Sequence, residues 1–92
     1  GEGKGVPVLV ALTDKVFTDH PHLRRFAGRM REDNIAMRKT LLRSGFVKEA
    51  HLRQEWPLPD GRRVAEVAYG RLRSDWEAGT VTGFEWEDVA AR

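Results

Sequence analysis

The sequence predicts a small mixed α/β domain whose elements follow in the order helix, strand, helix, strand, strand. Apolar residues recur at helical spacing behind the glycines that open the chain. A second apolar stretch lies between Asn34 and Gly45, which are typical of a helix start and a helix stop. Two strand-like segments then flank a Leu-Pro-Asp-Gly turn at residues 58–61. With 92 residues, the chain is long enough for one core and one domain.

The first helix is expected directly after the opening glycines. Val8, Leu12 and Val16 recur every four residues and, with the flanking Leu9, Ala11 and Phe17, form a wide stripe that should face the core. Pro21 disfavours helical geometry in the residue before it and should end the helix. Residues 23–30 are then expected as the first strand.

The second helix is expected to begin at an N-cap, either Asp33 or Asn34. It should stop at Gly45, where glycine readily adopts the positive φ of a C-terminal cap. Its core-facing residues are expected to be Ile35, Met37, Leu41 and Leu42.

Residues 46–57 and 62–73 are expected to form an antiparallel hairpin, with strand 23–30 beside 46–57. Gly61 supplies the positive φ that the connecting turn requires. The domain is expected over residues 1–76, and residues 77–92 are expected as an acidic, aromatic tail.

The composition excludes several classes of function. The chain has no cysteine, which excludes disulfides, thiolate metal sites and thiol nucleophiles. Its 16 basic and 14 acidic residues leave a net charge of only +2, so a polyanionic partner is not required. No apolar run reaches membrane-spanning length and no signal peptide is evident, so a cytoplasmic domain that does not enter a membrane is expected.

The opening segment GEGKG has two interpretations, a flexible leader or a phosphate-binding loop. In the second, Gly1, Gly3 and Gly5 let the backbone approach a pyrophosphate while the N-terminus of the following helix faces it. The segment is too compact for a dinucleotide fingerprint, and its lysine is not followed by the Ser or Thr of a P-loop. The three histidines lack metal-ligand spacing, so no metal site is expected.

Taken together, three segments resemble the GNAT superfamily of acetyl-coenzyme A-dependent N-acetyltransferases, and most closely its RimJ/RimL-type branch. They read GEGKG, REDNIAMRKTLLRSGFVKEAHLR and DGRRVAEVAYGRLRSDW. The matching residues are Gly1, Gly3, Gly5, Asn34, Gly45, Phe46, Glu49, Asp60, Gly61 and Tyr69. The resemblance extends to about Trp76 but covers only the C-terminal half of the family's α/β domain, and the family's N-terminal strands are expected to be missing from this chain.

This resemblance implies transfer of an acetyl group from acetyl-coenzyme A to a primary amine, on a protein N-terminus or a small molecule. It implies that Gly1, Gly3 and Gly5 hold the coenzyme pyrophosphate. Asn34 would line the pantetheine arm, and Arg38 would meet a coenzyme phosphate.

The catalytic residues are not identified. The family's usual general-acid positions fall on Leu41 and Met37, and neither can donate a proton. The backbone N–H that polarises the thioester lies on a strand outside this chain in the resemblance. The 92 residues alone are therefore expected to be inactive.

Two other functions stay open. One is a non-catalytic remnant of the same fold that binds coenzyme or a partner. The other is a small basic nucleic-acid-binding domain, which only the number of arginines supports, because aromatic residues do not interleave with them. Strand 23–30 is expected to present an exposed edge, and an exposed edge favours a homodimer.

Overall fold

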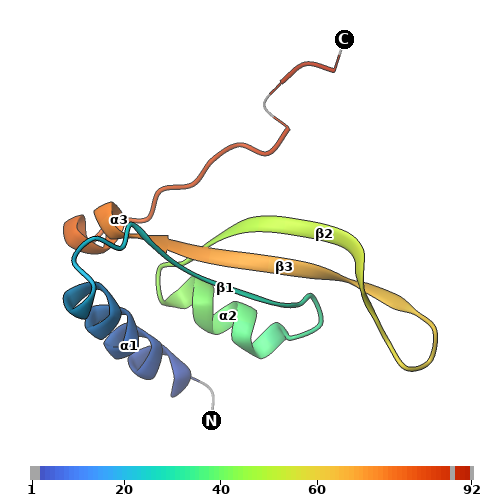
Figure 1. Ribbon diagram of the computed structural model, residues 1–92, viewed down its shortest axis with the longest axis horizontal. Coiled ribbons are helices and arrows are strands. Elements are labelled where there is room, and N and C mark those ends of the chain that lie inside the picture. Colours follow the sequence, from blue (N-terminus) through green and yellow to red (C-terminus); the bar gives the residue numbers. More distant parts are fainter. Residues whose placement is uncertain (1–2, 88, 92) are drawn as a thin grey trace.

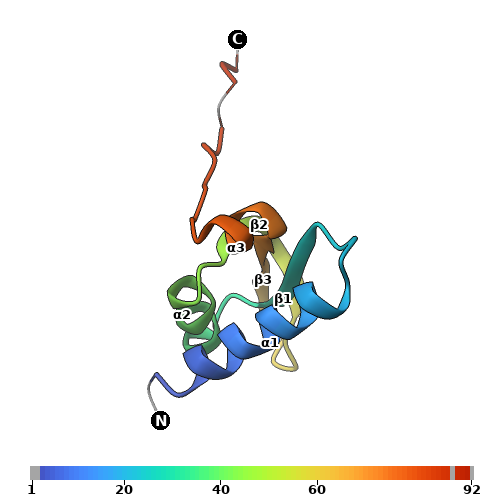
Figure 2. The same cartoon turned by 90° about the vertical axis from the view of Figure 1, so that its left-hand side faces the viewer.

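The computed structural model describes residues 3–87 and 89–91. Its elements are α1 (Gly5–Asp19), β1 (Arg25–Arg31), α2 (Ile35–Arg43), β2 (Val47–Pro57), β3 (Arg63–Leu72) and α3 (Arg73–Ala78). The strands form one sheet in the order β1-β3-β2. Helices α1 and α2 lie on the same side of this sheet, and α3 lies at the end where β3 stops (Figures 1 and 2).

The predicted helix caps and the hairpin turn are confirmed. The Asn34 side chain accepts a hydrogen bond from the Met37 N–H at 3.3 Å and so caps α2. Gly45 has a φ of 90°, and the N–H of Phe46 donates to the Leu41 carbonyl at 2.9 Å, which closes the C-terminal end of α2. Gly61 also has a φ of 90°, as the predicted turn requires.

The predicted pairing of strand 23–30 with 46–57 is wrong. Strand β1 instead pairs antiparallel with β3, with Ala27 opposite Gly70, and β2 pairs with the other side of β3. The central position suits β3, which carries the buried Ala65, Val67 and Tyr69 and has no fully exposed apolar residue. Strand β2 is charged and largely exposed, which suits the edge of a sheet.

The structure contains a third helix that the sequence analysis did not predict. Helix α3 ends at Gly79, whose φ of 70° is the left-handed conformation typical of a C-cap. Its Trp76 packs on Phe17 of α1, with ring centroids 5.1 Å apart. The domain was expected to end at residue 76, which lies inside this helix. The exposed segment after the helix extends away from the body of the molecule (Figure 1).

The predicted inward face of α1 is confirmed in part. Val8 and Leu12 are exposed, whereas Thr13 and Phe17 are buried and Leu9 packs against the core cluster. The Phe17 ring fixes this rotation, since it packs against Phe26 and Trp76 as well as the buried Arg73.

The predicted inward face of α2 is also largely wrong, because three of its four residues are exposed: Ile35, Met37 and Leu42. Leu41 alone of the four is buried. It joins Phe46, Val67 and Tyr69 in the core cluster.

No helix within residues 3–87 and 89–91 is both long and apolar enough to span a bilayer.

A buried carboxylate ties the segment after α3 to that helix. Asp75 accepts hydrogen bonds from the hydroxyls of Thr80 and Thr82, both at 2.7 Å, and from the Thr82 N–H at 3.2 Å. These bonds hold the pKa of Asp75 below its ordinary value, and the bond from the Thr80 hydroxyl has the largest effect.

This lowered pKa predicts a pH dependence of stability. A carboxylate with a depressed folded-state pKa stabilises the fold above its unfolded pKa, and this contribution is lost as the pH falls through the folded value. We therefore expect the difference in unfolding free energy between wild type and Asp75→Asn to shrink on acidification below about pH 4. Urea unfolding at neutral and acid pH measures it, with Glu85→Gln in the exposed segment as the control. A difference that stays constant with pH would contradict this assignment.

Candidate functional site

A groove of about 460 Å³ lies between the N-terminal end of α1 and the outer side of α2. It is lined by Gly3, Gly5, Ile35, Ala36, Lys39, Thr40 and Arg43. Two of the glycines that the sequence analysis selected therefore lie in it. Gly1 lies outside the described residues.

The backbone of α1 approaches the Thr40 side chain of α2 closely at Gly5. A Cβ atom on Gly5 would lie 3.1 Å from Cγ2 of Thr40, closer than an ordinary van der Waals contact. Gly3, just before α1, has a φ of 86°, a conformation that favours glycine. These two residues let α1 begin directly beside α2.

The groove has a positive electrostatic character. The first turn of α1 contains no acidic residue, and its N-cap residue Lys4 makes no side-chain capping bond. A helix start exposes unbonded N–H groups and carries a partial positive charge. Lys39 and Arg43 add two cations, and no acidic residue lies among the described lining residues. The groove therefore suits a ligand with several negative charges.

Asn34 lies at the start of α2, next to the groove rather than in its lining. Its side-chain oxygen is occupied by the Met37 N–H. It lines a second hollow of about 500 Å³ together with Met30, Arg31, Asp33 and Trp56. The first turn of α2 thus separates Asn34 from the groove.

Arg38 points toward the sheet instead of the groove. Its Nε donates to the Tyr69 hydroxyl at 3.0 Å, and its Nη1 donates to the Glu32 carbonyl at 2.6 Å. The predicted contact of Arg38 with a coenzyme phosphate stays a prediction. The cations that line the groove, Lys39 and Arg43, were missed by sequence reasoning. Their spacing of four residues was the available signal, because it places both on one face of α2.

The two positions that correspond to the family's general acid differ in environment. Leu41 is buried in the core cluster, whereas Met37 is exposed. Neither side chain can exchange a proton, so the described residues at these positions provide no general acid.

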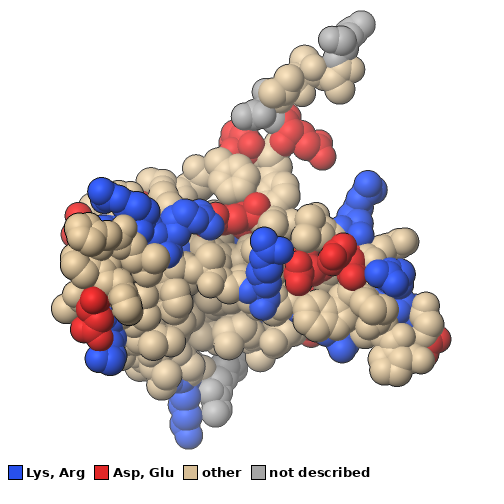
Figure 3. Space-filling model, in the orientation of Figure 1, with Lys and Arg blue, Asp and Glu red and all other residues tan. Residues whose placement is uncertain are grey.

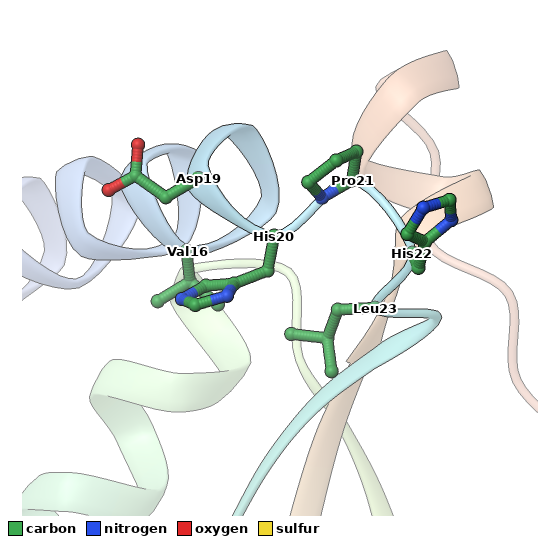
Figure 4. A pocket seen from close by; sticks show the side chains of 6 residues that line it. All are labelled: Val16, Asp19, His20, Pro21, His22 and Leu23. Carbon is green, nitrogen blue, oxygen red and sulfur yellow. The ribbon is translucent and has the colours of Figure 1, made fainter.

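A larger hollow of about 630 Å³ lies at the C-terminal end of α1. It is lined by Val16, Asp19, His20, Pro21, His22 and Leu23. The rings of His20 and His22 lie apart on either side of Pro21 (Figure 4). In the part of the chain that the structure describes, no three His, Asp or Glu side chains are placed to hold a metal ion.

The charged side chains on the face shown in Figure 3 are interspersed, with basic and acidic groups side by side. Several of the molecule's charged residues form ion pairs, including Arg25 with Glu49 at 2.5 Å and Arg62 with Asp60 at 2.7 Å. The face in Figure 3 has no continuous basic stripe of the kind that tracks a nucleic-acid backbone.

Comparison with known proteins gives matches of structure only. No protein-family model and no curated protein matches the sequence. The chain is similar to the spermidine/spermine N-acetyltransferase SpeG from Vibrio cholerae, with a TM-score of 0.71 and 23% identity over 86% of this chain and 45% of that one. It is also similar to the microcin C7 self-immunity acetyltransferase MccE, solved with acetyl-CoA and AMP, with a TM-score of 0.60 and 26% identity over 77% of this chain and 39% of that one.

A third solved protein, described as a probable acetyltransferase, is 28% identical, with a TM-score of 0.62 over 82% of this chain and 42% of that one. The chain thus spans less than half the length of each of these three proteins. The matches show that it has the α/β fold of GNAT acetyltransferases, as the sequence analysis expected.

Proposed function

We propose that this chain is the coenzyme-binding half of an N-acetyltransferase that transfers an acetyl group from acetyl-coenzyme A to a primary amine. One observation carries the proposal. Within a GNAT fold, one groove contains the N-terminus of α1, which has no side-chain cap, and two cations of α2. The described residues that line this groove include no acid.

The residues of the groove fit the coenzyme. Acetyl-coenzyme A supplies an acetyl thioester and carries a diphosphate. Gly3 and Gly5 have no side chains to obstruct a diphosphate, and the first N–H groups of α1 can donate to its oxygens. Asn34, on the other side of the first α2 turn, would line the pantetheine arm.

The proposed reaction is direct acyl transfer. The nitrogen of a neutral primary amine forms a bond to the thioester carbonyl carbon and loses one proton to water, and the carbon–sulfur bond breaks to release a thiolate. Backbone N–H donors stabilise the negative charge that develops on the carbonyl oxygen. Leu41 and Met37 supply no proton to the thiolate, so water or a group outside this chain would supply it.

The acceptor in this proposal is a primary amine, on a protein N-terminus or on a small molecule. SpeG, one of the solved neighbours, is a spermidine/spermine acetyltransferase by its description. A homodimer through strand β1 stays part of the proposal, since β1 is an edge strand of the described sheet.

A calorimetric titration with acetyl-coenzyme A tests the proposal. We expect saturable binding of one coenzyme per chain and no comparable binding of a short RNA. A non-catalytic remnant of the fold would also bind the coenzyme but would give no transfer in a longer chain. Tighter binding of the RNA would overturn the proposal in favour of the nucleic-acid alternative.

A further inference from the structure

We propose that Lys48 is a site of covalent acetylation, where His51 acts as the general base while the lysine amine attacks an acetyl thioester. Lys48 lies on β2 and is not among the residues that line the groove between α1 and α2. The inference therefore goes beyond the proposed function and does not depend on coenzyme binding in that groove.

A shift in strand register brings Lys48 and His51 together. In a regular strand, side chains three residues apart point to opposite faces of the sheet. The register of β2 against β3 shifts between Lys48 and Ala50, so that Lys48 lies opposite Tyr69 and His51 lies opposite Val67. These two partners are two residues apart on β3 and share one face. The shift thus places Lys48 and His51 on the same face, where Nζ of Lys48 lies 2.8 Å from Nδ1 of His51.

The contacts of His51 define the role of each ring nitrogen. A lysine ammonium can only donate, so Nδ1 is the acceptor and the neutral ring carries its proton on Nε2. Nε2 lies 3.8 Å from a carboxylate oxygen of Glu32, which follows β1. A proton taken up at Nδ1 would make the ring an imidazolium, and Glu32 is within ion-pair distance of that new charge. An amine, a base and a carboxylate therefore follow one another, as in other activated nucleophiles.

The proposed step is an acyl transfer to Nζ. After the ammonium has lost one proton to water, the neutral Nζ of Lys48 forms a bond to the carbonyl carbon of the thioester. His51 takes up at Nδ1 the proton that the attacking nitrogen loses. The carbon–sulfur bond breaks, and the leaving thiolate takes this proton from the imidazolium. The products are an acetylated lysine, a free thiol and the neutral His51 ring.

Acetylation would change the contact between β2 and the segment that follows α3. The Lys48 ammonium lies over the Trp86 ring, 5.9 Å from its centroid. Acetylation removes the positive charge of lysine, and a neutral amide lacks the cation–π attraction to an aromatic ring. The modification would therefore weaken the contact of Trp86 with β2.

Incubation of the chain with S-acetyl-N-acetylcysteamine, a small acetyl thioester without a nucleotide, tests the inference. Mass spectrometry of the peptides measures the rate of acetylation at each lysine. Lys39 is the internal reference, because the described residues around it in the groove include no histidine. We expect Lys48 to react at least about tenfold faster than Lys39 at neutral pH. This factor is below that of an enclosed general base, because the His51 side chain is 35% exposed.

Three variants separate the role of the base from that of a structural contact. His51→Ala should lower the rate at Lys48 to about that at Lys39. His51→Gln should do the same, because its amide can accept a hydrogen bond from Lys48 but cannot take up the proton. His22→Ala is the matched control, since it removes an imidazole from the connection between α1 and β1 and should leave the rate at Lys48 unchanged.

Equal rates at Lys48 and Lys39 in wild type would overturn the inference. It would also be overturned if His51→Gln reacted at Lys48 as fast as wild type, because His51 would then only position the lysine. Since the thioester carries no nucleotide, either result leaves the proposed function standing. Failure of the coenzyme titration would in turn leave the acetylation of Lys48 standing.

Discussion

Arg73→Ala should destabilise the fold by about 3 kcal/mol or more. Arg73 is 8% exposed, and its guanidinium donates to the backbone carbonyls of Leu23 at 2.7 Å, Phe17 at 2.6 Å and His20 at 2.7 Å. It also stacks on the rings of Phe17 and Trp76. One side chain thus joins the end of α1, the connection to β1 and the start of α3. Its loss removes a hydrogen bond from each of three backbone carbonyl groups.

Urea unfolding followed by circular dichroism measures this effect. Arg62→Ala is the matched control, because the Arg62 side chain is exposed and its ion pair with Asp60 should change stability by less than about 1 kcal/mol. Arg73→Lys should fall between wild type and alanine, since an ammonium group cannot reproduce the planar fork of a guanidinium. If Arg73→Ala and Arg62→Ala unfold at the same urea concentration, Arg73 does not hold these elements together.

The 92-residue chain alone should show no acetyl transfer above background, even where it binds the coenzyme. The thioester-polarising N–H lies outside this chain in the resemblance, and one oxyanion donor contributes about two to three orders of magnitude in rate. The loss of acceptor positioning lowers the rate further. Release of free thiol with a panel of primary amines measures the transfer.

A chain that supplies the other half of the domain is the positive control, and it should acetylate some primary amine. Robust turnover by the 92 residues alone would show that the active site is misplaced or that a second copy completes it.

Local signals in the sequence predicted the elements well, whereas their packing could not be read from it. Asn34, Gly45 and Gly61 act through bonds and dihedral angles within a few residues, so each was found at its expected place. The position of β3 between the other strands depends on the relative burial of two distant segments. The rotation of α1 depends on the contact of Phe17 with Trp76, which belongs to a helix that the sequence analysis did not expect.

The candidate site likewise contains residues that a local sequence signal indicated and residues that only the packing of the helices brings there. Gly3 and Gly5 were predicted because glycine before a helix has a local meaning. Lys39 and Arg43 are two of 16 basic residues, and nothing in the sequence distinguished them from the others. Only the side-by-side packing of α1 and α2 places them near Gly3 and Gly5. Arg38 was selected in their place, although the helical period turns it toward the Tyr69 hydroxyl.

The affinity of Gly3→Val for acetyl-coenzyme A tests the central claim most directly. Gly3 has a φ of 86°, and a Cβ atom added to it would meet no other atom within 4 Å. Valine there therefore strains the loop and obstructs the backbone face offered to the diphosphate, without a clash inside the fold. Gly61→Val is a matched control, because Gly61 has a φ of 90° and equally open surroundings but lies in the distant hairpin turn. His51→Ala on β2 is a second control.

The account predicts that Gly3→Val weakens acetyl-coenzyme A binding by at least about tenfold, which corresponds to about 1.4 kcal/mol. Gly61→Val and His51→Ala should bind as wild type does wherever they are folded. Equal affinity of Gly3→Val and the two controls would contradict the account and reduce GEGKG to an ordinary leader.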